Sequence, residues 1–284
     1  MRPCAKVFDV LQSSRLPLIM GVVNVTPDSF YVGSRTPRPE AAIERGLRLC
    51  VEGADMLDVG GQSTRPGSEP VCEQEELRRV IPVIEGLAGQ AGVAISIDTD
   101  KASVARKALK AGASILNDVS ALRNDPDMAK AALGYEAVIL MHRGGKNSKT
   151  MQDNPVYENV LEEVKQFLIE RRNVFLRAGG EASRALFDPG IGFGKNLEHN
   201  LSLIKHLDEL GALGPVALGV SRKSFLGRLA APDQNNIPGP EERLEGSLAV
   251  ACWAVMAGVK VLRVHDALAT RRALQVLGAI QEAQ

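Results

Sequence analysis

The stretch Ala137-Val138-Ile139-Leu140-Met141-His142 is a short apolar run that ends in a polar residue, and the chain repeats this pattern eight times. The eight apolar runs lie at residues 18–23, 56–59, 94–97, 115–116, 137–141, 185–187, 215–220 and 260–264. They are rich in β-branched residues and too short for helices, which is typical of strands buried on both faces of a parallel sheet.

Between these runs the apolar residues follow the period of an amphipathic helix. One such face consists of Val156, Val160, Val164, Phe167, Leu168, Val174 and Phe175, and Asn154-Pro155 predicts its N-terminus. Glycines after the helical stretches, at positions 53, 112, 134, 179, 211 and 258, predict left-handed C-caps.

Eight strand–helix units in about 250 residues predict an α/β fold, specifically a (β/α)₈ TIM barrel. A doubly wound open sheet is the alternative. The residues before Leu18 form a short N-terminal extension, which we expect to be a lid or hairpin over the bottom of the barrel. No linker-like change of composition occurs, so we expect a single domain over residues 1–284.

The composition argues against several classes of partner. The 34 Lys and Arg residues balance 34 Asp and Glu residues, which disfavours nucleic acid and anionic membranes. No stretch of eighteen apolar residues occurs, and we expect no membrane span or signal peptide. Cys4, Cys50, Cys72 and Cys252 are widely separated and lack metal-ligand spacing. These features predict a reduced, cytoplasmic protein whose thiols are packing residues.

Polar side chains follow nearly every predicted strand, at the barrel face where active sites form. The residues concerned include Asn24, Asp98, Asn117, His142, Asp188, Lys223 and His265. A single Asn, Asp or Ser at such a place is most simply the N-cap of the next helix, and we keep that interpretation for Asp118, Ser224 and Asp266. Capping does not account for Arg65 and Arg263.

The polar residues form two chemical groups. Asp98, Asn117 and Asp188 suit a flat nitrogen heterocycle, whose amidine-like N–H pair can meet a carboxylate in bidentate fashion. The residues that suit an anion, such as a diphosphate with its metal, are Asn24, Thr64, Arg65, Arg263 and His265. The glycine-rich stretch from Gly190 to Lys195 lacks both the P-loop and the dinucleotide-binding spacing. A lysine at a strand end could alternatively be a Schiff-base nucleophile.

An ordered series of short motifs gives the chain a family resemblance. The motifs are Met20-Gly21-Val22-Val23-Asn24-Val25-Thr26-Pro27-Asp28-Ser29-Phe30, Asp58-Val59-Gly60-Gly61-Gln62-Ser63-Thr64-Arg65-Pro66-Gly67, Ile97-Asp98-Thr99, Asn117-Asp118, Met141-His142, Asp188-Pro189-Gly190-Ile191-Gly192-Phe193-Gly194-Lys195, Ser221-Arg222-Lys223-Ser224 and Arg263-Val264-His265-Asp266. In this order, from Leu18 to the C-terminus, they resemble the dihydropteroate synthases, pterin-binding barrel enzymes of folate biosynthesis.

The resemblance implies a transferase that condenses 6-hydroxymethyl-7,8-dihydropterin diphosphate with p-aminobenzoate to 7,8-dihydropteroate and diphosphate. It implies that the pterin is bound by Asp98, Asn117, Met141, Asp188 and Lys223. It implies that p-aminobenzoate is bound by Thr64, Arg65, Pro66, Phe193 and Ser224. Diphosphate would meet Asn24, Arg263 and His265, with Mg²⁺ at Asn24.

The catalytic residues implied in this way are Asn24, Lys223, Arg263 and His265. Diphosphate departs first, in an SN1-like reaction, and leaves a cation that the pterin ring delocalises. The amine then attacks this cation, so neither a protein nucleophile nor a Ser–His or Cys–His pair is expected. The family commonly forms homodimers, and Trp253 is either an interface residue or part of the outer-ring core.

Three departures from the family pattern concern segments beside the site. The family usually has Glu at Gln62, Ser-Asp-Gly-Gly at residues 31–34 and a Met-Gln-Gly-like stretch at residues 143–145. Sulfonamides mimic p-aminobenzoate, and we hypothesise that this chain discriminates against them better than most relatives do.

Two other functions are compatible with the same barrel. One is the pterin-binding part of a corrinoid-dependent methyltransferase, which the Arg263-Val264-His265 and Ser221-Arg222-Lys223 motifs disfavour. The other is a catalytically silent paralogue that binds pterins or a protein partner. Such a paralogue would be expected to have lost Asn24, Lys223 or His265, and all three are present.

Overall fold

The computed structural model describes residues 10–11, 13–26, 39–63, 68–145, 151–152, 154–231, 233 and 236–283. These residues form one sheet of eight parallel strands in the order β6-β5-β4-β3-β2-β1-β8-β7. The strands are β1 (Leu18–Asn24), β2 (Met56–Gly60), β3 (Ala94–Asp98), β4 (Ile115–Asp118), β5 (Ala137–Met141), β6 (Ala185–Asp188), β7 (Ala217–Gly219) and β8 (Val261–Val264). A parallel bridge between Phe187 and Val216 joins the two end strands. The sheet therefore closes into a barrel, and the alternative of an open sheet was wrong.

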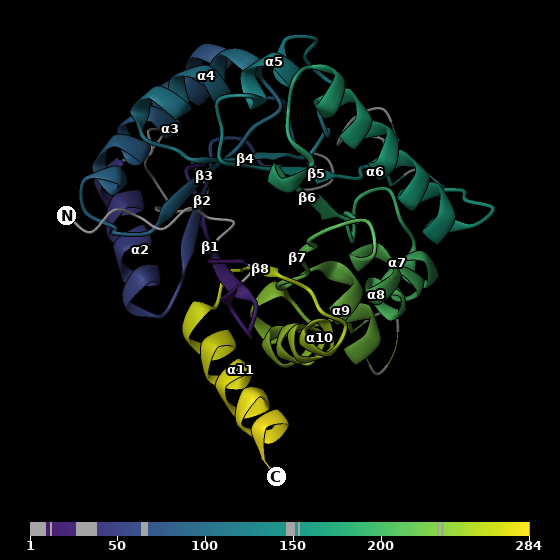
Figure 1. Ribbon diagram of the computed structural model, residues 1–284. Coiled ribbons are helices and arrows are strands. Elements are labelled where there is room, and N and C mark those ends of the chain that lie inside the picture. The colour runs from purple at the N-terminus through teal and green to yellow at the C-terminus, as the bar shows by residue number, and fades with distance from the viewer. Residues whose placement is uncertain are drawn as a thin grey trace.

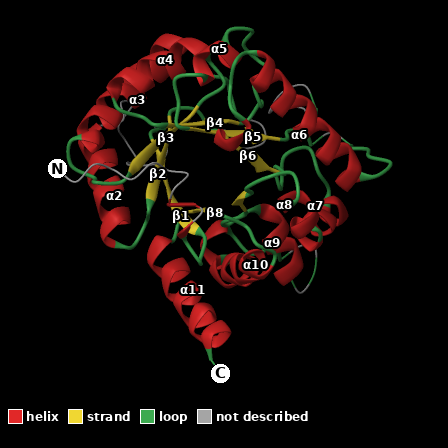
Figure 2. Ribbon diagram, in the orientation of Figure 1, coloured by secondary structure: helices red, strands yellow, loops and turns green. Residues whose placement is uncertain are grey.

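Helices surround the strands on the outside (Figures 1 and 2). They are α2 (Pro39–Val51), α3 (Glu73–Ala88), α4 (Ala102–Ala111), α5 (Met128–Ala132), α6 (Val160–Arg177), η2 (Ala182–Arg184), α7 (Leu197–Lys205), α8 (Leu207–Gly211), α9 (Ser224–Ala230), η3 (Pro240–Glu242), α10 (Leu244–Met256) and α11 (Ala267–Glu282). The predicted (β/α)₈ TIM barrel is thereby confirmed.

Apolar side chains fill the lower end of the barrel. The cluster there consists of Leu11, Leu18, Met20, Met56, Ile115, Ala137, Ile139, Leu186, Ala217 and Val261. Full burial of one such large side chain contributes roughly 1.5–3 kcal/mol. Leu11 belongs to the N-terminal extension, so its described residues cover the bottom of the barrel as expected. Val10 and Leu11 are helical, and the expected hairpin is not what these residues form.

Side chains alternate between the two faces of a strand, so every second residue after an inward-facing one also points into the barrel. The strand positions two or four residues after the members of this apolar cluster include Asn24, Gly60, Asp98, Asn117, Met141, Asp188, Gly219 and Arg263. All of these except Gly219 belong to the sequence motifs. The alternation of the strands therefore points the motif residues into one shared lumen.

One helix begins later than its apolar pattern suggests. Helix α6 starts at Val160, not at Pro155, and Val156 is 76% exposed. The side chain of Asn159 accepts hydrogen bonds from the N–H groups of Leu161 and Glu162 at 3.1 and 3.2 Å. This N-cap satisfies the first free donors of the helix, which fixes its start at residue 160.

The predicted C-cap glycines are mostly confirmed. Those at positions 53, 112, 179 and 258 have φ between 79° and 114°, in the left-handed region. The two at positions 134 and 211 are not among the glycines with positive φ.

Candidate active site

Arg263 extends from β8 and bridges two carboxyl groups on neighbouring strands β2 and β3. Its Nε is 2.6 Å from Oδ2 of Asp58, and its Nη2 is 2.9 Å from Oδ2 of Asp98. Burial acts to lower the pKa of Arg263, but the carboxylates outweigh it and raise that pKa above the usual value. Burial raises the pKa of Asp98 to about 8, although Arg263 opposes the shift. The site thus contains a charged guanidinium beside a carboxyl group whose pKa burial raises.

Asn117 lies next to this pair on the neighbouring strand. Asp98 and Asn117 are direct partners in the β3–β4 register, and both are at least nine-tenths buried. Nδ2 of Asn117 is 3.1 Å from Oδ2 of Asp58. Asp58, Asp98, Asn117 and Arg263 therefore form one connected polar group, drawn from four strands.

The loop after β6 folds back over the lumen. Oδ1 of Asp188 accepts a hydrogen bond from the N–H of Gly190 at 2.6 Å. Gly190 has φ +65°, and a Cβ there would lie 1.8 Å from the carbonyl oxygen of His142. Only glycine can occupy this position, because both the backbone conformation and the space exclude a side chain.

Lys223 reaches this loop from the start of α9. Its Nζ donates to the carbonyl oxygen of Ile191 at 2.5 Å and lies 4.5 Å from the centre of the Phe193 ring. Burial lowers the pKa of Lys223 to about 8, opposed by Asp188. A Cβ on Gly219 would lie 4.0 Å from Nζ of Lys223 and 3.7 Å from Cδ of Arg263. The missing side chain at Gly219 thus leaves room for two cations at the end of β7.

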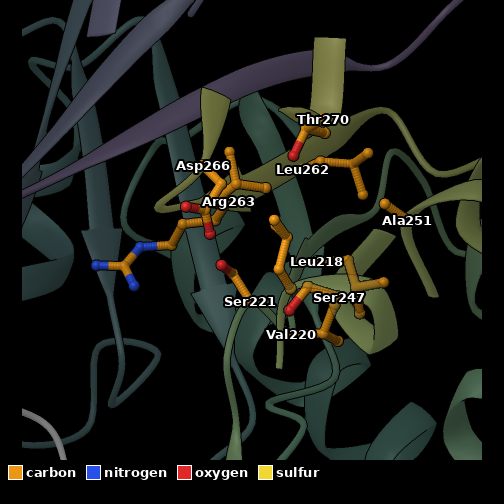
Figure 3. A pocket seen from close by; sticks show the side chains of 11 residues that line it. Leu218, Val220, Ser221, Ser247, Ala251, Leu262, Arg263, Asp266 and Thr270 are labelled. Atoms are coloured by element: carbon orange, nitrogen blue, oxygen red, sulfur yellow. The ribbon is translucent and has the colours of Figure 1, made fainter. Parts of the chain in front are cut away.

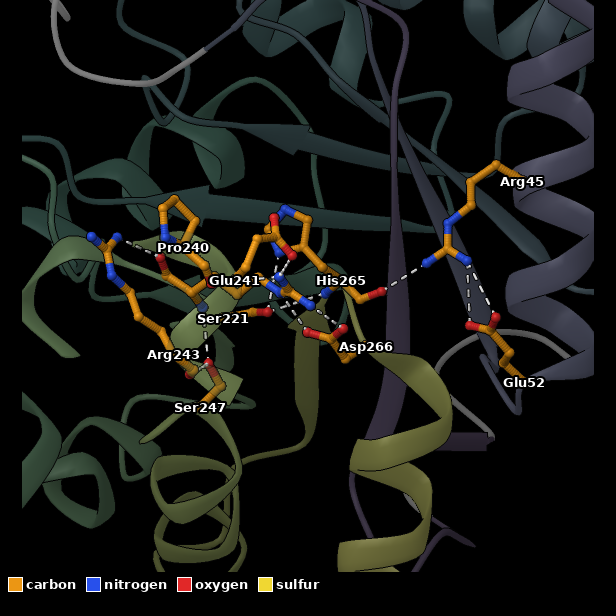
Figure 4. Close-up of polar contacts among 10 residues, drawn as sticks. Arg45, Glu52, Ser221, Pro240, Glu241, Arg243, Ser247, His265 and Asp266 are labelled. Carbon is orange, nitrogen blue, oxygen red and sulfur yellow. Dashed lines mark hydrogen bonds and ion pairs between the residues drawn. The ribbon is translucent and has the colours of Figure 1, made fainter. Parts of the chain in front are cut away.

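His265 follows β8 and contacts a serine. Its Nδ1 is 3.1 Å from Oγ of Ser221, which also accepts the backbone N–H of His265 at 3.2 Å (Figure 4). The expectation of no Ser–His pair was therefore wrong. Ser221 is buried, and its hydroxyl holds the backbone and the ring of His265 in place.

Arg222 and Asp266 form a bidentate ion pair beside His265. Nε and Nη2 of Arg222 lie 2.8 and 2.6 Å from the two carboxylate oxygens of Asp266. Asp266 occupies the N-cap position of α11, but its side chain makes no capping hydrogen bond. The predicted capping role was wrong for this residue, because the fork of Arg222 matches both carboxylate oxygens.

The other two predicted caps also differ. Ser224 is the first helical residue of α9, and Lys223 occupies the N-cap position. Asp118 accepts the N–H groups of Ser120 and Leu122, both at 2.7 Å, within a turn that precedes α5.

Asn24 offers an unused amide at the end of β1. Its side chain has no hydrogen-bond partner among the residues that the structure describes, and it pairs in register with Gly60. Mg²⁺ is commonly bound through one or two protein oxygens together with substrate phosphates and water. The amide oxygen of Asn24 fits that role. Within the described ranges, no group of three or more His, Cys, Asp or Glu residues could hold a metal.

Two of the three departures from the family pattern fall on described residues. Oε1 of Gln62 accepts hydrogen bonds from Nζ of Lys101 at 2.8 Å and from the N–H of Val71 at 3.1 Å. Arg143 is buried and donates to Oδ1 of Asn124 at 3.3 Å. The third departure, at residues 31–34, lies outside the described residues, as do the predicted aminobenzoate contacts Thr64, Arg65 and Pro66.

Comparison with known proteins agrees with this geometry. Residues 20–265 match the family described as pterin binding enzyme. Dihydropteroate synthase of Escherichia coli K12 is 44% identical over 94% of this chain and 93% of its own. The chain belongs to the pterin-binding enzyme family.

Solved structures of pterin-binding enzymes share the fold of the chain. Dihydropteroate synthase of Xanthomonas albilineans with 4-aminobenzoic acid has a TM-score of 0.86 at 46% identity, covering 95% of this chain and 94% of that one. The enzyme of Yersinia pestis in a sulfonamide drug complex has a TM-score of 0.87 at 40% identity, covering 94% and 95%.

A small hollow outside the lumen is not the site of this pterin-binding enzyme. It lies between β7, β8 and helices α10 and α11, and its lining is largely apolar. Figure 3 shows Arg263 among the lining residues with its guanidinium directed away from the others. We interpret this hollow as incomplete packing between sheet and helices.

The sequence did not single out Asp58 or Lys195 as functional residues. Asp58 lies inside the apolar run Met56–Val59 and is 0% exposed. The available signal was its charge, since a carboxylate is costly to bury unless it is paired. Lys195 was interpreted only as the end of a glycine-rich loop. The structure shows that it is buried, with 3% of its surface exposed.

Among the described helices, none is both long and apolar enough to cross a bilayer. Cys50, Cys72 and Cys252 are free thiols.

Proposed function

We propose that this chain is a dihydropteroate synthase, which joins 6-hydroxymethyl-7,8-dihydropterin diphosphate to p-aminobenzoate. The observation that carries the proposal is the buried group of Asp98, Asn117 and Arg263 in the lumen, with Lys223 beside it. It combines hydrogen-bonding groups for a flat heterocycle with cations for a departing anion. A relative that is 44% identical, and a solved structure with the same fold that is 46% identical, are named for this activity.

The pterin contacts are assigned to Asp98, Asn117, Met141, Asp188 and Lys223. The carboxyl groups of Asp98 and Asp188 are buried but have few protein donors. Asp98 accepts a hydrogen bond from Arg263, and Asp188 accepts one from a backbone N–H. Ring N–H groups can supply the missing donors. A desolvated site of this kind rejects rings lacking those N–H groups by about 10⁴-fold.

The diphosphate contacts are assigned to Asn24, Arg263 and His265. The charge of Arg263 is secured by its raised pKa, so it can stabilise negative charge that develops on the leaving diphosphate. Such a contact is worth roughly 3–4 kcal/mol for one well-placed donor. We assign Asn24 to hold Mg²⁺, which when bound would neutralise diphosphate oxygens. No protein nucleophile takes part, and Lys223 orients the pterin rather than forming a Schiff base.

The aminobenzoate contacts are assigned to Thr64, Arg65, Pro66, Phe193 and Ser224. Phe193 packs against the ammonium of Lys223, and Ser224 is exposed at the start of α9. Sulfonamides would compete at this place. Better discrimination against them stays a prediction, which the ratio of the KM for p-aminobenzoate to the Ki of a sulfonamide tests. A ratio like that of the Escherichia coli enzyme would contradict it.

One assay separates the synthase from the two other functions. Diphosphate release from the pterin substrate is measured with and without p-aminobenzoate, together with pteroate formation. A synthase releases diphosphate and forms pteroate stoichiometrically when the amine is present. A methyltransferase part forms no pteroate, and a silent paralogue binds the pterin without turnover.

A homodimer is a further part of the proposal. Trp253 is 51% exposed on α10, although its indole N–H donates to the carbonyl oxygen of Ile204 at 2.9 Å. Met256 and Ile280 also expose apolar surface, on α10 and α11. Sedimentation should show a dimer that Trp253→Arg weakens, whereas Val51→Arg, at an exposed apolar residue of α2, should leave it intact. A monomeric wild type would contradict this assignment. The cytoplasmic location and the single domain over residues 1–284 stay predictions.

A further inference from the structure

Asp58 is a carboxylate that no ligand in the lumen can reach directly. It is 0% exposed on β2, yet its Oδ2 receives both Nε of Arg263 at 2.6 Å and Nδ2 of Asn117 at 3.1 Å. Its Oδ1 has no hydrogen-bond partner in the part of the chain that the structure describes. Oδ2 of Asp58 therefore contacts both Asn117, which we assign to the pterin, and Arg263, which we assign to the diphosphate.

We propose that Asp58 is a positioning residue, which fixes the amide of Asn117 so that its carbonyl oxygen faces the pterin and locks the guanidinium of Arg263 beside it. This role rests on the proposed function, and it adds Asp58 as a residue that acts on ligands only through Asn117 and Arg263.

The orientation of Asn117 follows from the chemistry of its partner. An ionised carboxylate only accepts hydrogen bonds, so the amide must turn its NH₂ group toward Asp58. Its Oδ1 then lies on the opposite side of the amide, as an acceptor. The reverse orientation would place two acceptor oxygens against each other in a buried site, with no donor between them. The Oδ1 of Asn117 is therefore set to accept a hydrogen bond from a ring N–H group, while the second N–H of its Nδ2 remains a donor.

The orientation of Arg263 follows from two contacts on different edges of its guanidinium. Nε is held by Asp58 and Nη2 by Asp98, which fixes the plane of the fork. Nη1 has no partner among the described residues. Without Asp58 only the contact with Asp98 would remain, and the guanidinium could rotate about it.

The test is a set of binding measurements with 6-hydroxymethylpterin, which carries no diphosphate and so isolates the path through Asn117. Calorimetry compares the wild type, Asp58→Asn, Asn117→Ala and the double variant. We expect Asp58→Asn to weaken binding about tenfold, the effect of losing roughly one oriented hydrogen bond. In the Asn117→Ala background, the same substitution should weaken binding by no more than about twofold.

An exchange of the two side chains provides a rescue. Asp58→Asn combined with Asn117→Asp restores the hydrogen bond between residues 58 and 117 with its direction reversed, and the new carboxylate still presents an oxygen to the ring. The Nε of Arg263 loses its acceptor at residue 58 in this variant, which a pterin without diphosphate does not probe. We expect pterin affinity within about threefold of the wild type, using the same double-mutant logic. If Asp58→Asn does not fold alone, the exchanged variant decides: retained affinity supports the proposal, and lost affinity contradicts it.

A matched control breaks an Arg–Asp pair at the other end of β2. Asp55 directly precedes β2, and its Oδ2 lies 2.5 Å from Nη2 of Arg271 and 2.7 Å from the N–H of Ile19. Asp55→Asn should lower the unfolding temperature but leave pterin affinity unchanged.

The outcomes separate this inference from the proposed function. Unchanged affinity in Asp58→Asn, or effects of Asp58→Asn and Asn117→Ala that simply multiply, would overturn the positioning role. If the wild type itself fails to bind the pterin, the proposed function falls instead.

Discussion

The ammonium nitrogen of Lys195 lies 2.8 Å from Nδ1 of the buried His142. It also donates to the carbonyl oxygens of Gly190 and Phe193, at 3.0 and 3.1 Å. One buried lysine therefore joins the end of β5 to the loop after β6, whose Ile191 carbonyl receives Lys223.

Lys195→Met should destabilise the protein and loosen this loop. The substitution leaves carbonyl oxygens and a ring nitrogen buried without a donor, at a cost of about 2–3 kcal/mol. Urea denaturation measures the loss, and the KM for the pterin substrate should rise because Lys223 loses a fixed partner. Lys130→Met, at an exposed lysine of α5, is the control. Equal stability of the two variants would contradict the structural role of Lys195.

His142 should make the fold sensitive to acid. Burial, together with the nearby charge of Lys195, lowers the pKa of His142 to about 2, against about 6.5 in an unfolded chain. The unfolded state therefore binds a proton below pH 6.5 that the folded state does not, and stability falls as the pH falls through this range. His142→Asn keeps an acceptor for Lys195 without titrating. The free energy of unfolding should drop more for the wild type than for this variant between pH 7 and pH 5.

Asp98 should have the opposite pH dependence. Its folded pKa of about 8 lies above the unfolded value of about 3.9, so the folded state holds its proton over this interval. Stability contributed by the protonated form is complete below pH 4 and is lost as the pH rises toward 8. Asp98→Asn should therefore become more stable relative to the wild type as the pH is raised. A stability difference that does not change with pH would show that Asp98 is ionised throughout.

Asp188→Ala should abolish detectable pterin binding. The substitution leaves ring N–H groups without an acceptor in a desolvated pocket, and it removes the partner of the Gly190 N–H. Isothermal titration with 6-hydroxymethylpterin is the measurement, and near-normal affinity would rule out the assignment of Asp188 to the pterin.

His265→Ala should separate binding from catalysis. The ring lies beside Ser221 after β8, in the group that we assign to the diphosphate. We expect pterin affinity to be kept and kcat to fall about 10²-fold or more, as for the loss of one charge-stabilising donor. Unchanged turnover would remove His265 from the catalytic assignment.

The sequence predicted the barrel, and it predicted which strand ends face one lumen, because both depend on local periodicity. Eight apolar runs with polar ends specify eight strands, and their alternation points Asn24, Asp98, Asn117 and Asp188 into the same lumen. These residues lie at strand ends, where position along the chain determines position in space.

Contacts between distant segments could not be read in this way. Arg263 and Asp98 were assigned to different ligands from the sequence, but the structure joins them by a hydrogen bond across 165 residues of chain. The contact between Lys195 and His142 depends likewise on how two loops fold back. The start of α6 was misplaced because Val156 continues the apolar pattern beyond the residue where Asn159 caps the helix.

The apolar plug formed by Leu11, Met20 and Met56 has a consequence for the order of events. Among the described residues these side chains close the lower end of the lumen, so a ligand should enter and leave at the end where the strands finish. On the assignments proposed above, the pterin lies deeper than p-aminobenzoate, so it should bind first and leave last.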